Sequence, residues 1–300
     1  MIGRRVKKLL DAAIGAIAVA LLRAVKLTNR ERAANFAAAV MRRIGPLLPE
    51  HRLGRANLRA AFPEKSAAEI ERILSGVWDN LGRVAAEFVH LNEFRVEYPD
   101  TSDTDTVIFD PIMVERVQRV IAAKATLSFA CHSGNWEIPA VIGHQLGVNS
   151  AILYRRPNIA AIGDAIVGLR GGVMGQMIPT RLDAAVRLAH LLQEGMHVGM
   201  LVDQHYTKGV DVQFFGRPCK ANPLIALLAR EFDCPVYGLR AIRLPDRNRL
   251  RIEITDPVEL PRDGDGRIDV QSAMQAITNV VEGWVREYPD QWLWLHRRWR

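Results

Sequence analysis

The sequence predicts an α/β fold, with a mostly parallel central sheet flanked by helices and a helical N-terminal region. Two patterns predict it. Residues 1–92 show helical periodicity only, whereas after about residue 100 short apolar runs alternate with helix-period segments. The chain has 300 residues, of which 49% are hydrophobic and 24% charged, a composition that excludes bulk disorder and allows a sizeable core. The three cysteines are odd in number and widely spaced, which favours a reducing compartment over a disulfide framework.

The helical N-terminal region contains four predicted helices. The first holds the apolar run 12–22; the second, over residues 28–45, ends at Gly45-Pro46, and the third, over 51–62, stops before Pro63. The fourth is the clearest, because Ser66 and Glu69 form a capping box before an apolar stripe that repeats every three or four residues to Leu91.

The alternating region supplies the predicted sheet. Candidate strands cover residues 126–130, 151–154, 176–178, 198–202, 236–242 and 250–254, and a last helix covers 270–287. Helices are expected to start near residues 110, 136, 158, 180 and 222. Three of these starts carry capping residues, namely Asp110 before Pro111, Thr180 with Asp183, and Asn222 before Pro223. We expect 27–300 to be one domain, with 27–92 as its helical part.

The positive charge is concentrated in the N-terminal arm. Residues 1–60 hold 13 Lys and Arg against three acids, whereas the other 240 residues hold 27 against 30. The apolar run 12–22 is flanked by basic residues, and as a helix it reaches only about 16 Å, half of the roughly 30 Å bilayer core. No small-residue cleavage site follows it, and its alanine-rich centre argues against nucleic acid. A core helix is one interpretation; we expect residues 1–26 to lie in a membrane interface, bound to anionic head groups.

The segment after the first main strand, residues 131–137, carries the first candidate chemistry. His132 stands at the strand tip and Glu137 in the first turn of the next helix. A carboxylate that holds one imidazole nitrogen protonated would leave the other as a general base. The alternative is a histidine that only caps or packs. Ser133 lacks the surroundings of a nucleophilic serine. Gly134 permits a tight turn, and nearby backbone N–H groups or an arginine could stabilise an oxyanion.

Polar groups also follow other predicted strands. Asp203 and His205, with His132, leave a metal-dependent hydrolase open as an alternative, although no paired-ligand spacing supports it. Arg155, Arg156 and Arg170 suit a phosphate or carboxylate substrate. Four of the six tryptophans lie in the last 17 residues. They indicate either a segment at a membrane interface or a terminal segment packed in the protein.

Four sequence blocks resemble the bacterial lipid A biosynthesis acyltransferases, within the lysophospholipid acyltransferase superfamily. In chain order they are N-L-R-A-A-F-P-E from Asn57, H-S-G-N-W-E from His132, the D-Q and F-F-G-R-P segments from Asp203 and Phe214, and P-D-Q-W-L-W-L-H-R-R-W from Pro289. The resemblance covers nearly the whole chain.

The resemblance implies transfer of a fatty acyl chain from acyl carrier protein to a hydroxyl of a lipid A precursor. It implies an enzyme of lipopolysaccharide biosynthesis at the cytoplasmic face of the inner membrane. By motif match His132 is the base and Glu137 its orienting partner. We expect Asn135, Arg155, Arg170 and Asp203 to contact substrate. A thioester donor is already activated, so no cofactor or metal is expected, and no nucleic-acid partner either.

The resemblance leaves alternatives open. Family members often carry an N-terminal transmembrane helix, whereas the apolar run here is short, so interfacial attachment is favoured over a span. Related enzymes acylate other glycolipids or lysophospholipids, so the acceptor stays open. A non-catalytic lipid-binding scaffold, using the arm and the terminal tryptophans, is the third hypothesis beside the acyltransferase and the hydrolase.

Overall fold

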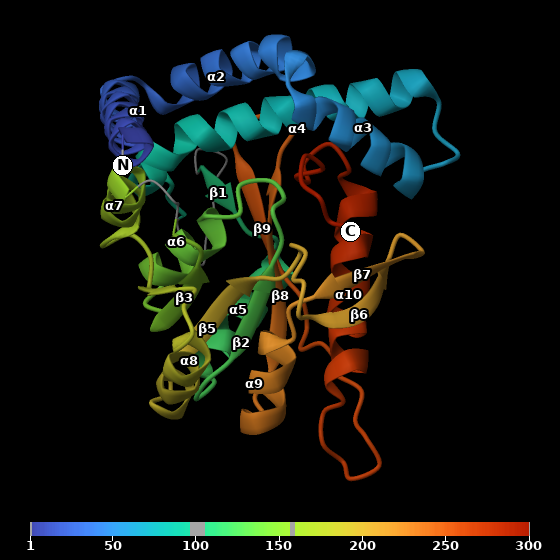
Figure 1. Cartoon of the computed structure of the whole chain (residues 1–300). Coiled ribbons are helices and arrows are strands. Elements are labelled where there is room, and N and C mark those ends of the chain that lie inside the picture. The colour runs from blue at the N-terminus through green and yellow to red at the C-terminus, as the bar shows by residue number, and fades with distance from the viewer. Residues whose placement is uncertain (1, 97–105, 157–159, 300) are drawn as a thin grey trace.

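The computed structural model describes residues 2–96, 106–156 and 160–299. Its centre is a seven-stranded sheet of order β1-β9-β8-β2-β5-β3-β4, in which every neighbouring pair is parallel except β8 with β9 (Figure 1). The strands are β1 (Val107–Ile108), β2 (Leu127–Ala130), β3 (Ser150–Tyr154), β4 (Gln176–Pro179), β5 (His197–Leu201), β8 (Val236–Arg243) and β9 (Leu250–Ile254). The predicted α/β class with its mostly parallel sheet is confirmed.

Helices cover both faces of the sheet. They are α5 (Pro111–Ala122), α6 (Ile138–Gln145), α7 (Ala160–Arg170), α8 (Ala184–Gln193), α9 (Leu224–Phe232) and α10 (Val270–Glu287). Alternate residues of β2 point to opposite faces. Leu127 and Phe129 join a closed core with α8, α9 and α10, whereas α5 and α6 pack on the other face with Tyr237 and Ile252. The second face also carries the cavity described below.

Four helices precede the sheet and lie across the top of Figure 1: α1 (Ile2–Lys26), α2 (Arg30–Ile44), α3 (Pro49–Ala61) and α4 (Ala67–Glu87). Ser66 forms the predicted capping box with Glu69. Helices α2 and α4 approach closely at Gly82, where a Cβ would lie 2.6 Å from the carbonyl oxygen of Ala37. Short 3₁₀ turns, η1 (Gly45–Leu47) and η2 (Phe88–Glu93), follow α2 and α4.

Helix α1 is longer than the apolar run that predicted it. In the described parts of the chain, 2–96, 106–156 and 160–299, no helix combines the length and the hydropathy that a membrane span requires. Helix α1 contacts α7 and η2, so it is attached to the rest of the fold over part of its length.

An antiparallel hairpin of β6 (Val210–Phe214) and β7 (Arg217–Ala221) lies outside the predicted strands. Its two-residue turn is Phe215-Gly216, and both residues have positive φ, 54° and 64°. Phenylalanine rarely adopts that conformation, and Pro218 is unusual within a strand. The pattern therefore gave no hairpin signal; packing of β6 on α10 holds the turn in place.

Helix starts agree with the sequence in part. Asn222 accepts a hydrogen bond from the N–H of Leu224 at the start of α9, at 3.1 Å. Asp110 occupies the cap position of α5 without a side-chain hydrogen bond to the helix. Thr180 does not cap α8, since its hydroxyl donates to the carbonyl of Tyr154 and the helix begins at Ala184. The expected start near residue 158 lies outside the described residues.

The terminal tryptophans belong to a packed segment. Trp292 and Trp294 are completely buried in the closed core, and Trp299 stacks on Phe214 of the hairpin. Their interpretation as a membrane-interface signature is therefore wrong for this segment. The C-terminal chain instead lies against the loop that follows β2, where Ser133 forms an antiparallel bridge with Trp292.

Candidate active site

His132 and Asp203 lie side by side at the carboxyl end of the sheet. Strands β2 and β5 are parallel neighbours in which Ala130 is level with Leu201. Two residues further on, His132 and Asp203 are therefore level with each other. The Nδ1–H of His132 donates to Oδ1 of Asp203 at 2.8 Å, and the His132 backbone N–H donates to Oδ2 at 2.9 Å.

Asp203 is held as a charged acceptor inside the protein. It is 3% exposed and also accepts the indole N–H of Trp292 at 2.8 Å. Burial alone would raise the pKa of Asp203, but the charge and hydrogen bonds of His132 hold it well below its usual value. The aspartate is thus ionised near neutral pH and fixes the tautomer of the imidazole.

The second ring nitrogen of His132, Nε2, is the one that could take part in proton transfer. Burial lowers the pKa of His132, but the charge and hydrogen bond of Asp203, with a smaller contribution from Glu137, raise it above the ordinary value. With Nδ1 committed to Asp203, Nε2 is the acceptor. The amide nitrogen of Gln204 lies 3.4 Å from Nε2, and the ring of Trp136 flanks the imidazole at 5.2 Å between centroids.

The predicted hydrogen bond between His132 and Glu137 does not occur. Glu137 is instead bound by Arg170, which donates from Nε at 2.9 Å and from a second nitrogen to the other carboxylate oxygen. The reason is the direction in which the Glu137 side chain points. Glu137 precedes α6 and its carboxylate contacts Arg170 at the end of α7, whereas Asp203 reaches the imidazole from the neighbouring parallel strand. Glu137 remains near enough to act on His132 by its charge.

Arg170 is oriented by more than its ion pair. Its guanidinium carbon lies 5.2 Å from the ring centre of Phe88 and 5.8 Å from that of Tyr154, within the range of cation–π contact. Arg170 also lines the cavity, so it presents positive charge to whatever enters there. Arg155 lines the same cavity and is exposed.

Asn135 has a different place from the expected one. It is completely buried, its side-chain N–H donates to Glu87 at 2.9 Å, and its Oδ1 accepts from the N–H of Glu137 at 3.2 Å. Asn135 and Asp203 were both expected to contact substrate; in the structure both side chains bond to protein partners and neither lines the cavity. Contact of either residue with substrate stays a prediction.

A sealed polar cluster under the loop was not predicted. Glu87 at the end of α4 pairs with Arg243 at the end of β8 through two hydrogen bonds of 2.7 Å. Both side chains are essentially inaccessible to solvent. Desolvation opposes ionisation, yet the nearby guanidinium of Arg243 lowers the pKa of Glu87. The sequence gives no signal for this pair, because Glu87 and Arg243 lie 156 positions apart.

Hydrogen bonds next to this cluster hold Gly134 in place. The carbonyl of Gly134 accepts a hydrogen bond from the side chain of Asn80 at 2.8 Å, and its N–H donates to the carbonyl of Gln291 at 3.2 Å. The φ of Gly134 is +56°, and a Cβ here would lie 1.8 Å from a backbone oxygen of Ala241, so only glycine fits. Because its N–H is already bonded, Gly134 is not a free oxyanion donor.

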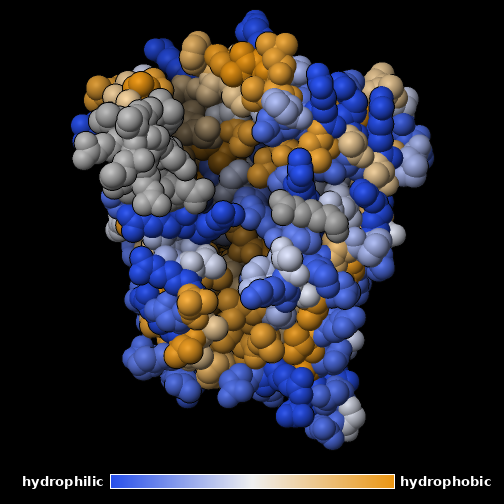
Figure 2. Space-filling view, in the orientation of Figure 1, coloured by the Kyte–Doolittle hydropathy of each residue, from blue (hydrophilic) through white to orange (hydrophobic). Residues whose placement is uncertain are grey.

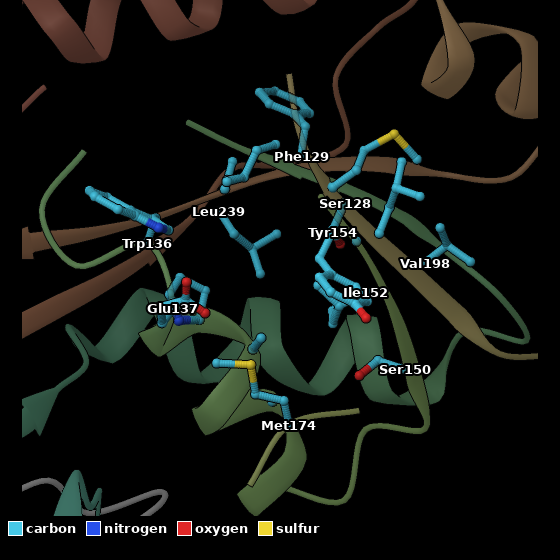
Figure 3. A pocket seen from close by; sticks show the side chains of 18 of the residues that line it. Ser128, Phe129, Trp136, Glu137, Ser150, Ile152, Tyr154, Met174, Val198 and Leu239 are labelled. Atoms are coloured by element: carbon cyan, nitrogen blue, oxygen red, sulfur yellow. The ribbon is translucent and has the colours of Figure 1, made fainter. Parts of the chain in front are cut away.

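A cavity of about 790 Å³ opens beside His132. Its rim includes Glu137, Arg155, Arg170 and Tyr206, and its walls are mostly apolar side chains from the sheet, α5 and α6. Figure 2 shows the molecule hollowed near its centre, with hydrophobic residues visible between hydrophilic ones. In Figure 3, Trp136 and Glu137 lie on one side of the cavity, while Ile152, Val198 and Ser150 lie on the other.

Small residues of the two central strands create the depth of this cavity. Ser128 and Ala130 of β2 and Gly199 of β5 lie on its wall, and a Cβ on Gly199 would come within 3.1 Å of Ile152. Larger side chains at these positions would fill the space between the sheet and α6. The cavity therefore extends between the sheet and α6, and the imidazole of His132 lies at one end of it.

A sequence comparison identifies the family. Residues 4–300 match the family model of the bacterial lipid A biosynthesis acyltransferases. The chain belongs to this family. A comparison with curated proteins gives no match. The resemblance predicted from the four sequence blocks is confirmed, and the acyltransferase places three of those blocks at one site: the loop after β2, Asp203, and the segment containing Gln291 and Trp292.

No group of three or more His, Cys, Asp or Glu side chains that could hold a metal ion occurs among the residues the structure describes. Asp203, one ligand of the alternative hydrolase site, has both carboxylate oxygens engaged by His132 and Trp292. The geometry thus favours a hydrogen-bonded dyad over a ligand set.

Proposed function

We propose that this lipid A biosynthesis acyltransferase moves a fatty acyl chain from acyl carrier protein to a hydroxyl of a lipid A precursor, with His132 as general base and Asp203 as its orienting partner. One observation carries the proposal: an imidazole fixed through Nδ1 by a buried aspartate presents Nε2 at the end of an apolar cavity. Such a cavity suits an acyl chain, and the free nitrogen suits a hydroxyl proton.

The reaction follows from this arrangement. The acceptor hydroxyl gives its proton to Nε2 of His132 as its oxygen attacks the thioester carbonyl. The tetrahedral intermediate collapses, the carbon–sulfur bond breaks, and the imidazolium returns the proton to the leaving thiolate. Asp203 stabilises the imidazolium by its charge, as in other histidine-carboxylate pairs. Arg170, held by Glu137, supplies positive charge near the developing oxyanion.

The rim of the cavity supports a carrier-protein donor. Arg155 is exposed at the rim, and acyl carrier protein is acidic, so opposite charge would steer the encounter. We expect Arg155→Glu to raise KM for acyl carrier protein, most strongly at low salt. A short thioester donor that lacks the carrier protein should show a smaller change. Equal changes with both donors would contradict a docking role for Arg155.

Helices α1 and α2 support attachment to the cytoplasmic face of the inner membrane. Large apolar side chains are exposed on these elements. They are Ile17 and Leu21 on α1, Leu27 just after α1, Phe36 on α2 and Leu47 on η1. Figure 2 shows hydrophobic residues gathered at the top of the view, where α1 and α2 lie. The exposed cations Arg23, Arg32 and Arg43 lie among them, a pairing that favours anionic lipid. Residues 1–26 would then act with α2, and the rest of 27–300 would form the catalytic domain.

Vesicle binding tests this attachment. Phe36→Ser with Leu47→Ser should weaken cosedimentation with anionic vesicles about tenfold, because burial of two large apolar side chains is lost. The matched control is Leu182→Ser with Leu227→Ser, which removes two exposed leucines near α8 and α9, at the opposite end of Figure 1. A loss of binding in the control alone would place the membrane face elsewhere.

Mass spectrometry of the lipids tests the proposed reaction. Cells or vesicles with the active enzyme should contain a lipid A precursor that is heavier by one acyl group. The His132→Ala variant should lack that product. The added mass identifies the acyl chain, and fragmentation identifies the acceptor; an acylated lysophospholipid in its place would favour the alternative acceptor class.

A further inference from the structure

Polar groups lie among the apolar side chains at the end of the cavity away from His132. Ser128, Ser150 and His197 line the cavity there, beside Leu146 and Val148. In Figure 3, Ser150 lies on the side of the cavity away from Trp136 and Glu137, with its hydroxyl directed toward the cavity. A ligand that enters beside His132 would thus meet these groups last.

Strand register gives the depth of this polar end. Ser150 of β3 is paired with His197 of β5, and His197 precedes Val198, which is level with Leu127. His197 is therefore level with Thr126, six residues before His132, while Ser128 is four residues before it. At about 3.3 Å per residue, these levels lie roughly 13 and 20 Å from His132.

The polar groups at this end have hydrogen-bonding capacity that the protein does not use. His197 is 8% exposed, and its Nδ1 pairs with the hydroxyl of Thr126 at 2.9 Å. Among the described residues, Nε2 of His197 and the hydroxyls of Ser128 and Ser150 make no hydrogen bond to a side chain or backbone group. Burial lowers the pKa of His197, so the imidazole is neutral near pH 7. Neutral polar groups in a cavity must bond to water or ligand.

Binding of the methyl end of a hydrocarbon chain is therefore unfavourable at this end of the cavity. An alkyl chain that reached these groups would displace water from them and give them no hydrogen-bond partner, which is unfavourable for a buried polar group. A fully extended chain advances about 1.3 Å per carbon, from ordinary C–C bond lengths and angles. The levels of Ser128 and His197 thus correspond to roughly 10 and 15 carbons.

We propose that Ser128, Ser150 and His197 set the acyl-chain selectivity of the enzyme, by excluding saturated chains that reach them and accepting a longer chain that carries an oxygen at its end. The proposal rests on the proposed function, because it takes the cavity as the acyl-chain site. Selection arises here from polarity at the inner end rather than from a steric wall alone, and this difference makes it testable.

The experiment compares acyl donors on the purified full-length enzyme. The donors are acyl carrier proteins loaded with saturated chains of even length from C10 to C18, and one with a C16 chain that bears a terminal hydroxyl. For the wild type, kcat/KM for plain C16 should be about tenfold or more below that of the best donor. The terminal hydroxyl should restore it several-fold, because the oxygen replaces the displaced water.

Two variants separate polarity from shape. Ser128→Ala with Ser150→Ala removes two hydroxyls with almost no change of volume. Thr126→Val with His197→Leu removes a hydrogen-bonded pair together, so that neither partner is left unpaired. In both, the penalty for plain C16 should shrink several-fold and the advantage of the terminal hydroxyl should disappear. Ile152→Val is the control, since it enlarges the cavity without changing polarity and should preserve the advantage of the hydroxyl.

The outcomes are distinct. If wild type transfers no chain from any donor, the proposed function fails. If the wild type transfers short chains but kcat/KM is the same for C16 with and without the terminal hydroxyl, the inference fails while the proposed function stands. An unchanged profile in a variant that retains its wild-type circular dichroism spectrum would also overturn the inference.

Discussion

Two charged clusters share the loop that follows β2, and they differ in what they face. His132 and Asp203 meet beside the cavity, and the imidazole lines it. Glu87 and Arg243 meet beneath the loop, where neither side chain reaches solvent. In both, a buried carboxylate accepts short hydrogen bonds from a basic side chain, so the difference lies in access. The first cluster suits proton transfer, and the second fixes Gly134 and Asn135, the residues that carry the loop.

This contrast teaches that a perturbed pKa alone does not mark the reactive group. The pKa of Glu87 and that of Asp203 are both lowered by a partner cation despite burial. Only Asp203 is joined to a residue on the cavity wall. The comparison predicts that variants of the first cluster lose activity and keep their fold, whereas variants of the second lose stability first.

Removal of His132 should give the largest effect on activity. His132→Ala should lower the acyl-transfer rate by about 10²–10⁴, the usual contribution of a general base. Its thermal unfolding should remain close to wild type, because the side chain lies at a cavity wall. The rate is measured by mass spectrometry of the acylated lipid. Near-normal activity of His132→Ala would show that His132 is not the general base.

Breaking the sealed pair should give the largest effect on stability. Arg243→Met leaves the Glu87 carboxylate buried without its partner, so the free energy of unfolding should fall by about 3–5 kcal/mol. Urea denaturation measures it. The double variant Glu87→Met with Arg243→Met should recover part of the loss, since it removes both charges. A single variant as stable as wild type would mean that this cluster does not hold the loop.

Replacing the orienting aspartate should reduce activity and shift its pH dependence. The base must be neutral, so activity falls as pH drops through the pKa of His132, which Asp203 raises above the ordinary value. Asp203→Asn should lower the rate about 100-fold, and the remaining activity should persist to lower pH because the imidazole protonates less readily. A pH–rate profile measures both. A midpoint that stays in place or rises would contradict the assignment.

The smallest effect is expected at the Arg170–Glu137 pair. Arg170→Lys keeps the charge but loses the two-point contact with Glu137, so kcat/KM should fall about tenfold. Stability should change little because the pair borders the cavity. Steady-state kinetics with one acyl donor measure the effect. A loss as large as that of His132→Ala would move Arg170 into the proton-transfer step.

The sequence could predict the sheet and its strand ends, because apolar runs and helical periodicity recur clearly after residue 106. It placed both His132 and Asp203 at the ends of strands. It could not pair them, since nothing in either segment says that β2 and β5 are neighbours, and the nearer carboxylate of Glu137 was the reasonable choice. Knowing the register would have been sufficient to find the dyad.

Other features depended on contacts between distant segments. The hairpin β6–β7 turns on Phe215 with a positive φ, a conformation that packing imposes and propensity opposes. The cluster of Glu87 and Arg243 joins residues 156 positions apart, and Asn135 bonds to Glu87 across 48 positions. The family resemblance located the loop correctly, but only the coordinates separate the residues that face the cavity from those that support it.

The central claim is that Asp203, and not Glu137, is the partner of His132, and titration of the His132 imidazole by NMR tests it most directly. The resonance is assigned by its absence in His132→Ala, and its pKa is compared in wild type, Asp203→Asn and Glu137→Gln. We predict a wild-type pKa above the ordinary value of a histidine, a marked fall in Asp203→Asn and a small one in Glu137→Gln. A larger fall in Glu137→Gln would contradict the account.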